Sequence, residues 1–148
     1  MNRLTLLSIL VFVGLSSVDI IHAQQPTTLL EVRLAETTPA SGLTEATLQG
    51  SDRNIYLHDM KVITNSDVLQ ARVVEDRGGF DVAIILTAEA GSKMATATST
   101  HTGRPLAIIV NGEVIAAPTV RDTIGDQAVI SGDFTRAEAE RIASGLGR

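Results

Sequence analysis

The chain has 148 residues, a net charge of −5 at pH 7 and no cysteine. The lack of cysteine excludes disulfide bonds, thiol catalysis and Cys-ligated zinc or iron–sulfur sites. The acidic balance and the scatter of the basic residues argue against nucleic acid as a partner. Aromatic residues make up only 3% of the chain, so aliphatic side chains must fill most of the core.

The N-terminus has the pattern of a secretory signal peptide (1–23). Arg3 precedes an apolar run at 4–15 that is too short to span a bilayer, and Ile21-His22-Ala23 forms a signal-peptidase site. We therefore expect cleavage between Ala23 and Gln24, a flexible leader at 24–28, and one exported domain at 29–148, either periplasmic or secreted. No later apolar run is long enough to cross a bilayer, so no integral membrane segment is expected after cleavage.

The first half of this domain is expected to form strands. Residues 30–35 alternate between apolar and charged side chains, which is the period of a strand with one buried face. Residues 37–52 are rich in Thr, Ser, Gly and Pro and predict an irregular loop. We also expect a short strand at 55–57, a turn with a helical start at 64–67, and a hairpin of strands 68–74 and 80–86 around residues 76–79.

A helix is expected to begin after Thr87, which has the side chain of an N-cap. Gly103 is the expected terminator, and Pro105 lies two residues beyond it. The hydroxyl-rich residues 96–102 predict a frayed, solvated helix end, with a polar surface for an extended partner as the alternative. The face expected to be buried carries Ala90, Met94, Ala97 and His101.

Asn111-Gly112 is the clearest local signal, because both positions of a tight two-residue hairpin need positive φ. This turn joins expected strands at 106–110 and 113–117, and Pro118 then ends the pairing or marks a sheet edge. A further strand is expected at 128–130, where Ser131-Gly132-Asp133 stops it.

Thr135 and Glu138 form a capping box for the last helix, and Phe134 is placed to staple its start. The order of strands, helix, hairpin, strand and helix predicts a single α+β domain, with two main helices packed on a largely antiparallel sheet. The buried stripe of the last helix is expected to be Ala139, Ile142, Ala143 and Leu146.

Residues with catalytic or ligand-binding chemistry are few. His58 and His101 lack the spacing of metal ligands, so we interpret them as ordinary exposed or half-buried polar residues. Asp122, Asp126 and Asp133 do not follow the spacing of a calcium loop and are interpreted as turn residues. Since no activated-serine motif occurs either, we assign no catalytic, metal or cofactor residue and expect no enzyme.

Several motifs of the second half occur in an order that resembles the periplasmic head domain of SecD and SecDF, subunits of the bacterial protein-export machinery. The resemblance is good over about 80–146 and looser over 30–74. Two departures are mild, since Met94 replaces a usual Phe and Asn111 replaces the turn Asp. No counterpart of the family's membrane helices is present, so proton-driven work is not expected. The matching motifs are Leu86-Thr87-Ala88-Glu89-Ala90, Gly103-Arg104-Pro105-Leu106-Ala107-Ile108, residues 111–118 and 130–135, and Glu138-Ala139. Within these motifs we expect a structural role for Gly103, Pro105, Asn111, Gly112, Pro118, Gly132, Phe134, Thr135 and Glu138.

The resemblance implies an exported, non-enzymatic module that binds a protein or peptide, as an accessory of protein export or envelope folding. Its partner would be a polypeptide or envelope protein, added as a strand at a sheet edge near Pro118 or the strand that begins at Leu30. The alternatives are a small exported hydrolase, with a site around His101 or residues 122–133, and a ligand-sensing domain on the same scaffold.

Overall fold

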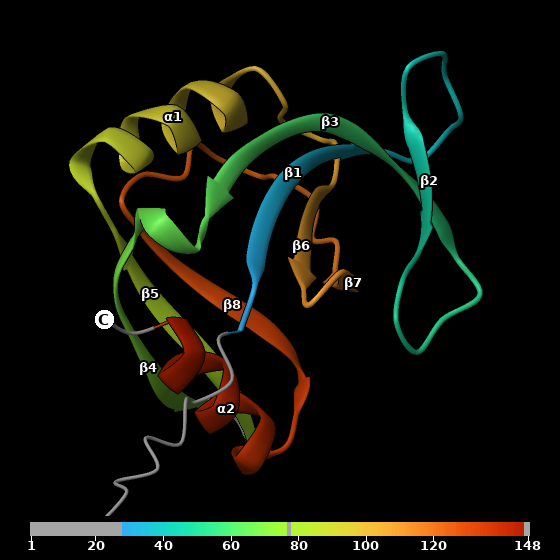
Figure 1. Cartoon of the computed structure of the whole chain (residues 1–148). Coiled ribbons are helices and arrows are strands. Elements are labelled where there is room, and N and C mark those ends of the chain that lie inside the picture. Colours follow the sequence, from blue (N-terminus) through green and yellow to red (C-terminus); the bar gives the residue numbers. More distant parts are fainter. Residues whose placement is uncertain (1–27, 77, 147–148) are drawn as a thin grey trace, which may run out of the picture.

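The computed structural model of the chain describes residues 28–76 and 78–146. Within this part of the chain the elements alternate between strands and two helices, as the sequence predicts (Figure 1). The helices are α1 (Ala88–Ser99) and α2 (Arg136–Leu146), and a 3-10 turn covers Asn65–Asp67. The strands are β1 (Leu30–Glu36), β2 (Thr44–Thr47), β3 (Asn54–Thr64), β4 (Val68–Asp76), β5 (Gly79–Leu86), β6 (Leu106–Val110), β7 (Glu113–Ala116) and β8 (Gln127–Phe134).

The strands form two antiparallel sheets. One sheet has the order β2-β3-β1-β6-β7 and the other has the order β4-β5-β8. The expected α+β class, with two helices on antiparallel strands, is confirmed, and the division into two sheets is new. It arises at the 3-10 turn, where Asp67 accepts a hydrogen bond from Thr64 N at 2.8 Å and the chain changes direction. β4 therefore pairs with β5 and not with the strands of the first sheet.

The main core lies between the two sheets. α2 packs against β4 and β5, and α1 packs against β3 (Figure 1). A smaller cluster on the opposite face of the five-stranded sheet contains Ala35, Ile55, Leu57, Ala107, Ile109 and Val114. Because successive strand residues point to opposite faces, the neighbours Ala107 and Ile108 serve different clusters.

Four expected boundaries are wrong. α1 ends at Ser99 with Thr100 as its C-cap, before Gly103, which was the expected terminator. The loop predicted at 37–52 contains β2, and the strand predicted at 55–57 extends over the whole of β3. β8 continues through Ser131-Gly132-Asp133, where a stop was expected. The ring of Phe134 occupies the space where a Cβ of Gly132 would lie, and Phe134 pairs with Phe80 of β5. This pairing keeps the chain extended up to the start of α2.

Both expected helix starts are confirmed. Thr87 Oγ1 accepts a hydrogen bond from Ala90 N at 3.2 Å. In the capping box of α2, Thr135 N donates to Glu138 Oε2 at 2.8 Å and Glu138 N donates to Thr135 Oγ1 at 3.3 Å. The buried stripe of α2 is the predicted one, whereas α1 buries Gly91 and Thr98 in place of the half-buried Ala97.

The Asn111-Gly112 turn is confirmed, with φ of 53° at Asn111 and 87° at Gly112. We expect Gly112→Val to lower the free energy of unfolding by about 1–2 kcal/mol, because a β-branched residue is strained at positive φ. Urea unfolding measures the loss. Gly112→Asn is the matched control and should lose less, since Asn tolerates this conformation. Equal stability of Gly112→Val and the parent would contradict the assigned turn.

The expected signal peptide, its cleavage site at Ala23 and Gln24, and the leader as far as residue 27 lie outside the described residues. Thr28 is buried beside α2, and its hydroxyl donates to the Arg141 carbonyl at 3.4 Å. Among the helices that the structure describes, none combines the length and the apolar character needed to cross a bilayer.

Candidate functional site

His58 and His101, which lie far apart in the sequence, are in contact. The ring centroids of His58 and His101 are 5.9 Å apart in an edge-to-face arrangement. His101 is only 1% exposed, so the expectation of an exposed or half-buried residue is wrong there, while His58 is half-buried. One distant and one nearby partner accompany the burial: His101 Nε2 lies 2.9 Å from the carbonyl oxygen of Ala35, 66 positions away, and 3.2 Å from that of Pro105.

The bonding of this histidine pair is structural. Nε2 of His101 faces two carbonyl oxygens, which only accept, so this nitrogen carries the proton and cannot act as a base. Nε2 of His58 lies 3.0 Å from Oε1 of Glu36, and Arg104 donates to the same oxygen at 2.9 Å. No group of three metal-ligating side chains occurs among the residues with assigned positions. The alternative of a hydrolase around His101 gains no support from this geometry.

Two glutamates on β1 have lowered pKa values. For Glu31, the hydrogen bond from Lys61 lowers the pKa most, burial opposes it, and a neighbouring arginine adds to the lowering. For Glu36, burial alone would raise the pKa, but the hydrogen bond from His58 and the positive charge of Arg104 outweigh burial. Both carboxylates therefore stabilise the fold in their charged form.

Acid unfolding tests these two carboxylates. Because their pKa values are lower in the folded protein, their stabilisation is complete above the unfolded value of about 4.3 and is lost as the pH falls through the folded values. We expect the thermal midpoint to fall between about pH 5 and pH 3, and less steeply in a Glu31→Gln/Glu36→Gln variant. Glu140→Gln, on the exposed side of α2, is the control. Parallel curves for all three proteins would refute the assignment.

Asp122 shows ordinary turn bonding, whereas Asp133 lies within β8, so its interpretation as a turn residue is wrong. Asp122 Oδ1 accepts a hydrogen bond from Thr123 N at 2.7 Å, and the backbone of Asp126 packs against α1 at Gly91. Thr98 holds this segment to the helix, since its hydroxyl donates to Met94 O at 2.8 Å and accepts from Ile124 N at 2.9 Å. Thr98 is fully buried, so the expected solvated helix end is wrong at this position.

The remaining family-motif residues lie at a junction beside β6. Gly103 N donates to the Val120 carbonyl at 2.8 Å, and Leu106 N donates to the Pro118 carbonyl at 2.9 Å. Pro105 faces Thr119 in an isolated antiparallel bridge. These contacts hold the chain after β7 against the start of β6, beside a shallow hollow of about 270 Å³ that Leu106, Pro118 and Val120 help to line.

The edge strands of the five-stranded sheet are β2 and β7, which limits where strand addition could occur as expected. β1 was expected at an edge, but it lies between β3 and β6, so that expectation is wrong. β7 is an edge strand, as Pro118 indicated. However, Gln49 N donates to the Val114 carbonyl at 2.8 Å, and Leu48 pairs with Val114 in a parallel bridge. The segment after β2 therefore covers part of this edge.

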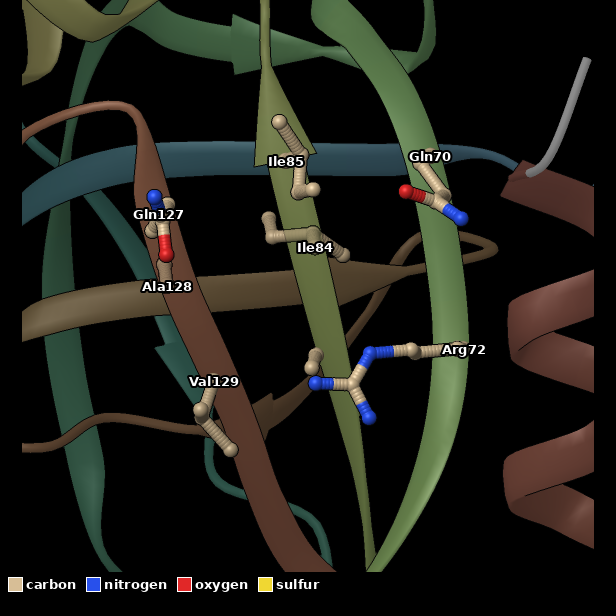
Figure 2. A pocket seen from close by; sticks show the side chains of 8 residues that line it. Gln70, Arg72, Ile84, Ile85, Gln127, Ala128 and Val129 are labelled. Atoms are coloured by element: carbon tan, nitrogen blue, oxygen red, sulfur yellow. The ribbon is translucent and has the colours of Figure 1, made fainter.

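The three-stranded sheet presents a hollowed face to solvent (Figure 2). Ile85 is 39% exposed and Val129 is 54% exposed on this face. They border a hollow of about 280 Å³. We name this surface the open face and define it by two rows of paired residues across β4, β5 and β8, Gln70–Ile85–Gln127 and Arg72–Ala83–Val129.

The open face combines an apolar floor with polar groups at its sides. The side chains of Gln70 and Arg72 on β4 and of Gln127 on β8 flank the apolar residues of the hollow (Figure 2). An apolar surface with a few placed donors suits a polypeptide, which presents apolar side chains together with polar main-chain groups.

A second hollow, of about 410 Å³, lies between β3 and α1 beside Met60. Its hydroxyl groups are turned into the helix, since Ser92 donates to Ala88 O and Thr96 donates to Ser92 O. Its two lysines are paired with glutamates. The hydroxyl and ammonium groups of this groove are thus already bonded within the protein. The open face is therefore the stronger candidate for a binding site.

One feature of the sequence could have indicated the open face: the strand at 80–86 carries apolar residues on both of its sides. In 80–86 the alternate residues Ala83 and Ile85 are apolar, although Val82 and Ile84 already supply the buried side of the strand. Apolar residues on both faces are typical of strands that are covered on both sides. Exposure of Ile85 therefore marks a surface that is available to a partner.

Comparison with known families accounts for the shared motifs. The family model of the SecDF P1 head subdomain matches residues 41–147. The chain belongs to this family. The resemblance inferred from the motifs is thus confirmed, and the match begins well before the region at 80–146 that carried it.

The relatives of this SecDF head are much longer proteins. Protein translocase subunit SecD of Koribacter versatilis is 34% identical over 82 residues, which are 55% of this chain and 15% of that protein. Protein translocase subunit SecDF of Thermus thermophilus is 38% identical over 84 residues, 55% of this chain and 11% of that protein. The chain therefore spans a small part of the length of these relatives.

Solved SecDF structures share the fold. SecDF in its super-membrane-facing form superposes with a TM-score of 0.65 at 27% identity, covering 81% of this chain and 18% of that one. A second SecDF structure, described as a membrane component that enhances protein export, gives a TM-score of 0.64 at 26% identity and covers 81% of this chain and 62% of that one.

Proposed function

We propose that this SecDF head is an exported accessory of protein export that binds an extended polypeptide on its open face. The export role is supported by the relatives, which are subunits of protein translocases. The proposed location, periplasmic or secreted, rests on the signal peptide expected at 1–23 with cleavage between Ala23 and Gln24. The partner is a polypeptide in transit or an envelope protein, and neither nucleic acid nor a cofactor takes part.

The exposure of Ile85 and Val129 around one hollow carries the proposal. Covering an exposed aliphatic side chain contributes about 1–2 kcal/mol, so two of them provide weak, reversible binding of a partner that must be released again. Because the floor of the hollow is aliphatic, it fits many apolar side chains and does not require one sequence.

Binding without catalysis is the mode that the geometry favours. Nε2 of His101 is bonded to the carbonyls of Ala35 and Pro105, and Nε2 of His58 is bonded to Glu36. Neither ring belongs to the hollow on the open face. A reaction would need a base and a reacting group within hydrogen-bond reach of one substrate position.

Charge on the open face should weaken binding. We expect Ile85→Asp and Val129→Asp each to lower the affinity for a labelled, permanently unfolded polypeptide about tenfold, because about 1.4 kcal/mol of apolar burial is lost. Fluorescence anisotropy measures the affinity. Met60→Asp, which places the same charge on the exposed apolar residue of β3, is the matched control. If Met60→Asp weakens binding and the other two variants do not, the groove between β3 and α1 is the binding site.

A further inference from the structure

We propose that Arg72 makes the open face selective for segments in which an acidic and an apolar residue are separated by one residue. This inference rests on the proposed function of the open face and adds the class of polypeptide that it selects. The partner group is a side-chain carboxylate, bound by the guanidinium next to the hollow.

Arg72 is a cation without an internal partner. Its side chain is exposed at the middle of β4 and extends over β5 toward the hollow (Figure 2). Among the described residues it takes part in no hydrogen bond or ion pair, whereas Arg33, Arg104 and Arg136 each bind a glutamate. A guanidinium has five donors in a planar fork that matches a carboxylate, so an acidic partner supplies the missing contact.

The residue opposite Arg72 leaves room for this contact. Arg72 pairs with Ala83 on β5, and Ala83 pairs with Val129 on β8. The small side chain of Ala83 keeps the guanidinium accessible from the open face, while Ile85 in the next row provides the apolar contact. One polypeptide can therefore reach the cation and the apolar floor together.

The distance between the two rows of the open face determines how far apart the contacting residues of a bound segment must be. Ile85 and Ala83 are two positions apart on β5, so their rows are separated by about 6.6–6.8 Å, the rise of two strand residues. An extended segment lying along β5 presents alternate side chains at the same interval. An apolar side chain over Ile85 then places the side chain two positions away over Arg72.

The neighbouring charges make this register specific. By alternation Asp81 shares the open face, in the row where it pairs with Val74. It is not within ion-pair distance of Arg72 in the structure, and it repels a carboxylate placed in its own row. An acidic residue is thus favoured over Arg72 and disfavoured one row further toward the β4–β5 turn.

Three acetylated and amidated peptides test the inference, because only side chains then supply a carboxylate. The first has Leu at its centre and Glu two positions away on each side, the second has Gln in place of both Glu, and the third has Glu directly beside Leu. We expect the protein to bind the first peptide about tenfold more tightly than the second or third, since only the first places a carboxylate where the guanidinium of Arg72 can bind it. In Arg72→Gln the first and second peptides should bind alike.

The control variant is Arg53→Gln, which removes an exposed arginine from the loop after β2 and should keep the tenfold preference. Thermal midpoints of both variants verify that the protein is folded. Equal binding of the first two peptides to the parent, with both weakened by Ile85→Asp, would overturn the role of Arg72 and leave the open face as the binding site. If no peptide binds, or Ile85→Asp changes nothing, both proposals are wrong.

Discussion

Replacing His101 with alanine is expected to lower the free energy of unfolding by about 2–4 kcal/mol. The imidazole is 1% exposed, so its removal leaves a cavity in a packed region. It also removes the donor that serves the carbonyl oxygens of Ala35 and Pro105. These two carbonyls belong to β1 and to the turn before β6, which are distant in sequence, and the ring adds to the hydrogen bond from Ala35 N to the Pro105 carbonyl at 3.0 Å.

His58→Ala is the matched control for this prediction. Its ring contacts His101 but is half-exposed, and its bond to Glu36 lies near the surface, so we expect a loss below about 1 kcal/mol. His101→Gln should recover part of the stability, because its amide can donate where the imidazole donates. Urea unfolding of the three variants gives the comparison. Equal losses in His58→Ala and His101→Ala would contradict the buried role of His101.

The His101→Ala variant also tests whether the histidine pair affects binding as well as stability. The open face belongs to the other sheet, so folded His101→Ala should bind an unfolded polypeptide within a few-fold of the parent. A large loss of binding without a loss of stability would instead make the histidine pair part of a functional site.

Local interactions explain which parts of the fold were predictable. The Asn111-Gly112 turn depends on the φ preference of two adjacent residues, and the capping box joins Thr135 to Glu138 within one helical turn. Both follow from a few neighbouring residues. The α+β class followed in the same way from the order of such local signals.

Long-range pairing explains the failures. β2 has an exposed and polar sequence, and only its pairing with β3 makes it a strand. His101 is buried because Ala35, 66 positions away in the chain, supplies an acceptor. The 3-10 turn redirects the chain locally, but the second sheet is completed by the pairing of β5 with the distant β8, which no period or spacing reveals. Such contacts depend on the tertiary fold, which overrides local propensity.

The open face as a whole could not be predicted from the sequence either, because it also depends on long-range pairing. Residues 80–86 predict a strand, but which side of this strand is covered depends on where α2 packs. Ile85 and Val129 are separated by more than forty positions and become neighbours only through the pairing of β5 with β8. The sequence indicated a polypeptide-binding module through its family resemblance, while the surface that can bind emerged from the structure.

Replacing Gly91 with alanine is expected to destabilise the protein by about 2–3 kcal/mol, although alanine is the better helix former by about 1 kcal/mol. Gly91 is buried on the face of α1 that meets the segment before β8. A Cβ at this position would lie 2.7 Å from Cβ and 2.9 Å from Cα of Asp126. The contact is with the backbone, so no side-chain rotation can relieve it.

Residues 124–126 would have to move to make room for the added methyl group, and hydrogen bonds hold this segment at both ends. Asp126 O accepts a hydrogen bond from Leu86 N at 2.8 Å, and Ile124 N donates to Thr98 at 2.9 Å. Gly125→Ala is the matched control, because no atom lies within 4 Å of its Cβ position, and its effect should stay within about 0.5 kcal/mol. Because β8 begins directly after Asp126, Gly91→Ala should also shift Gln127 and weaken polypeptide binding, whereas Gly125→Ala should not. Thermal unfolding and anisotropy on both variants measure the two effects, and equal behaviour of the variants would show that α1 does not approach this backbone closely.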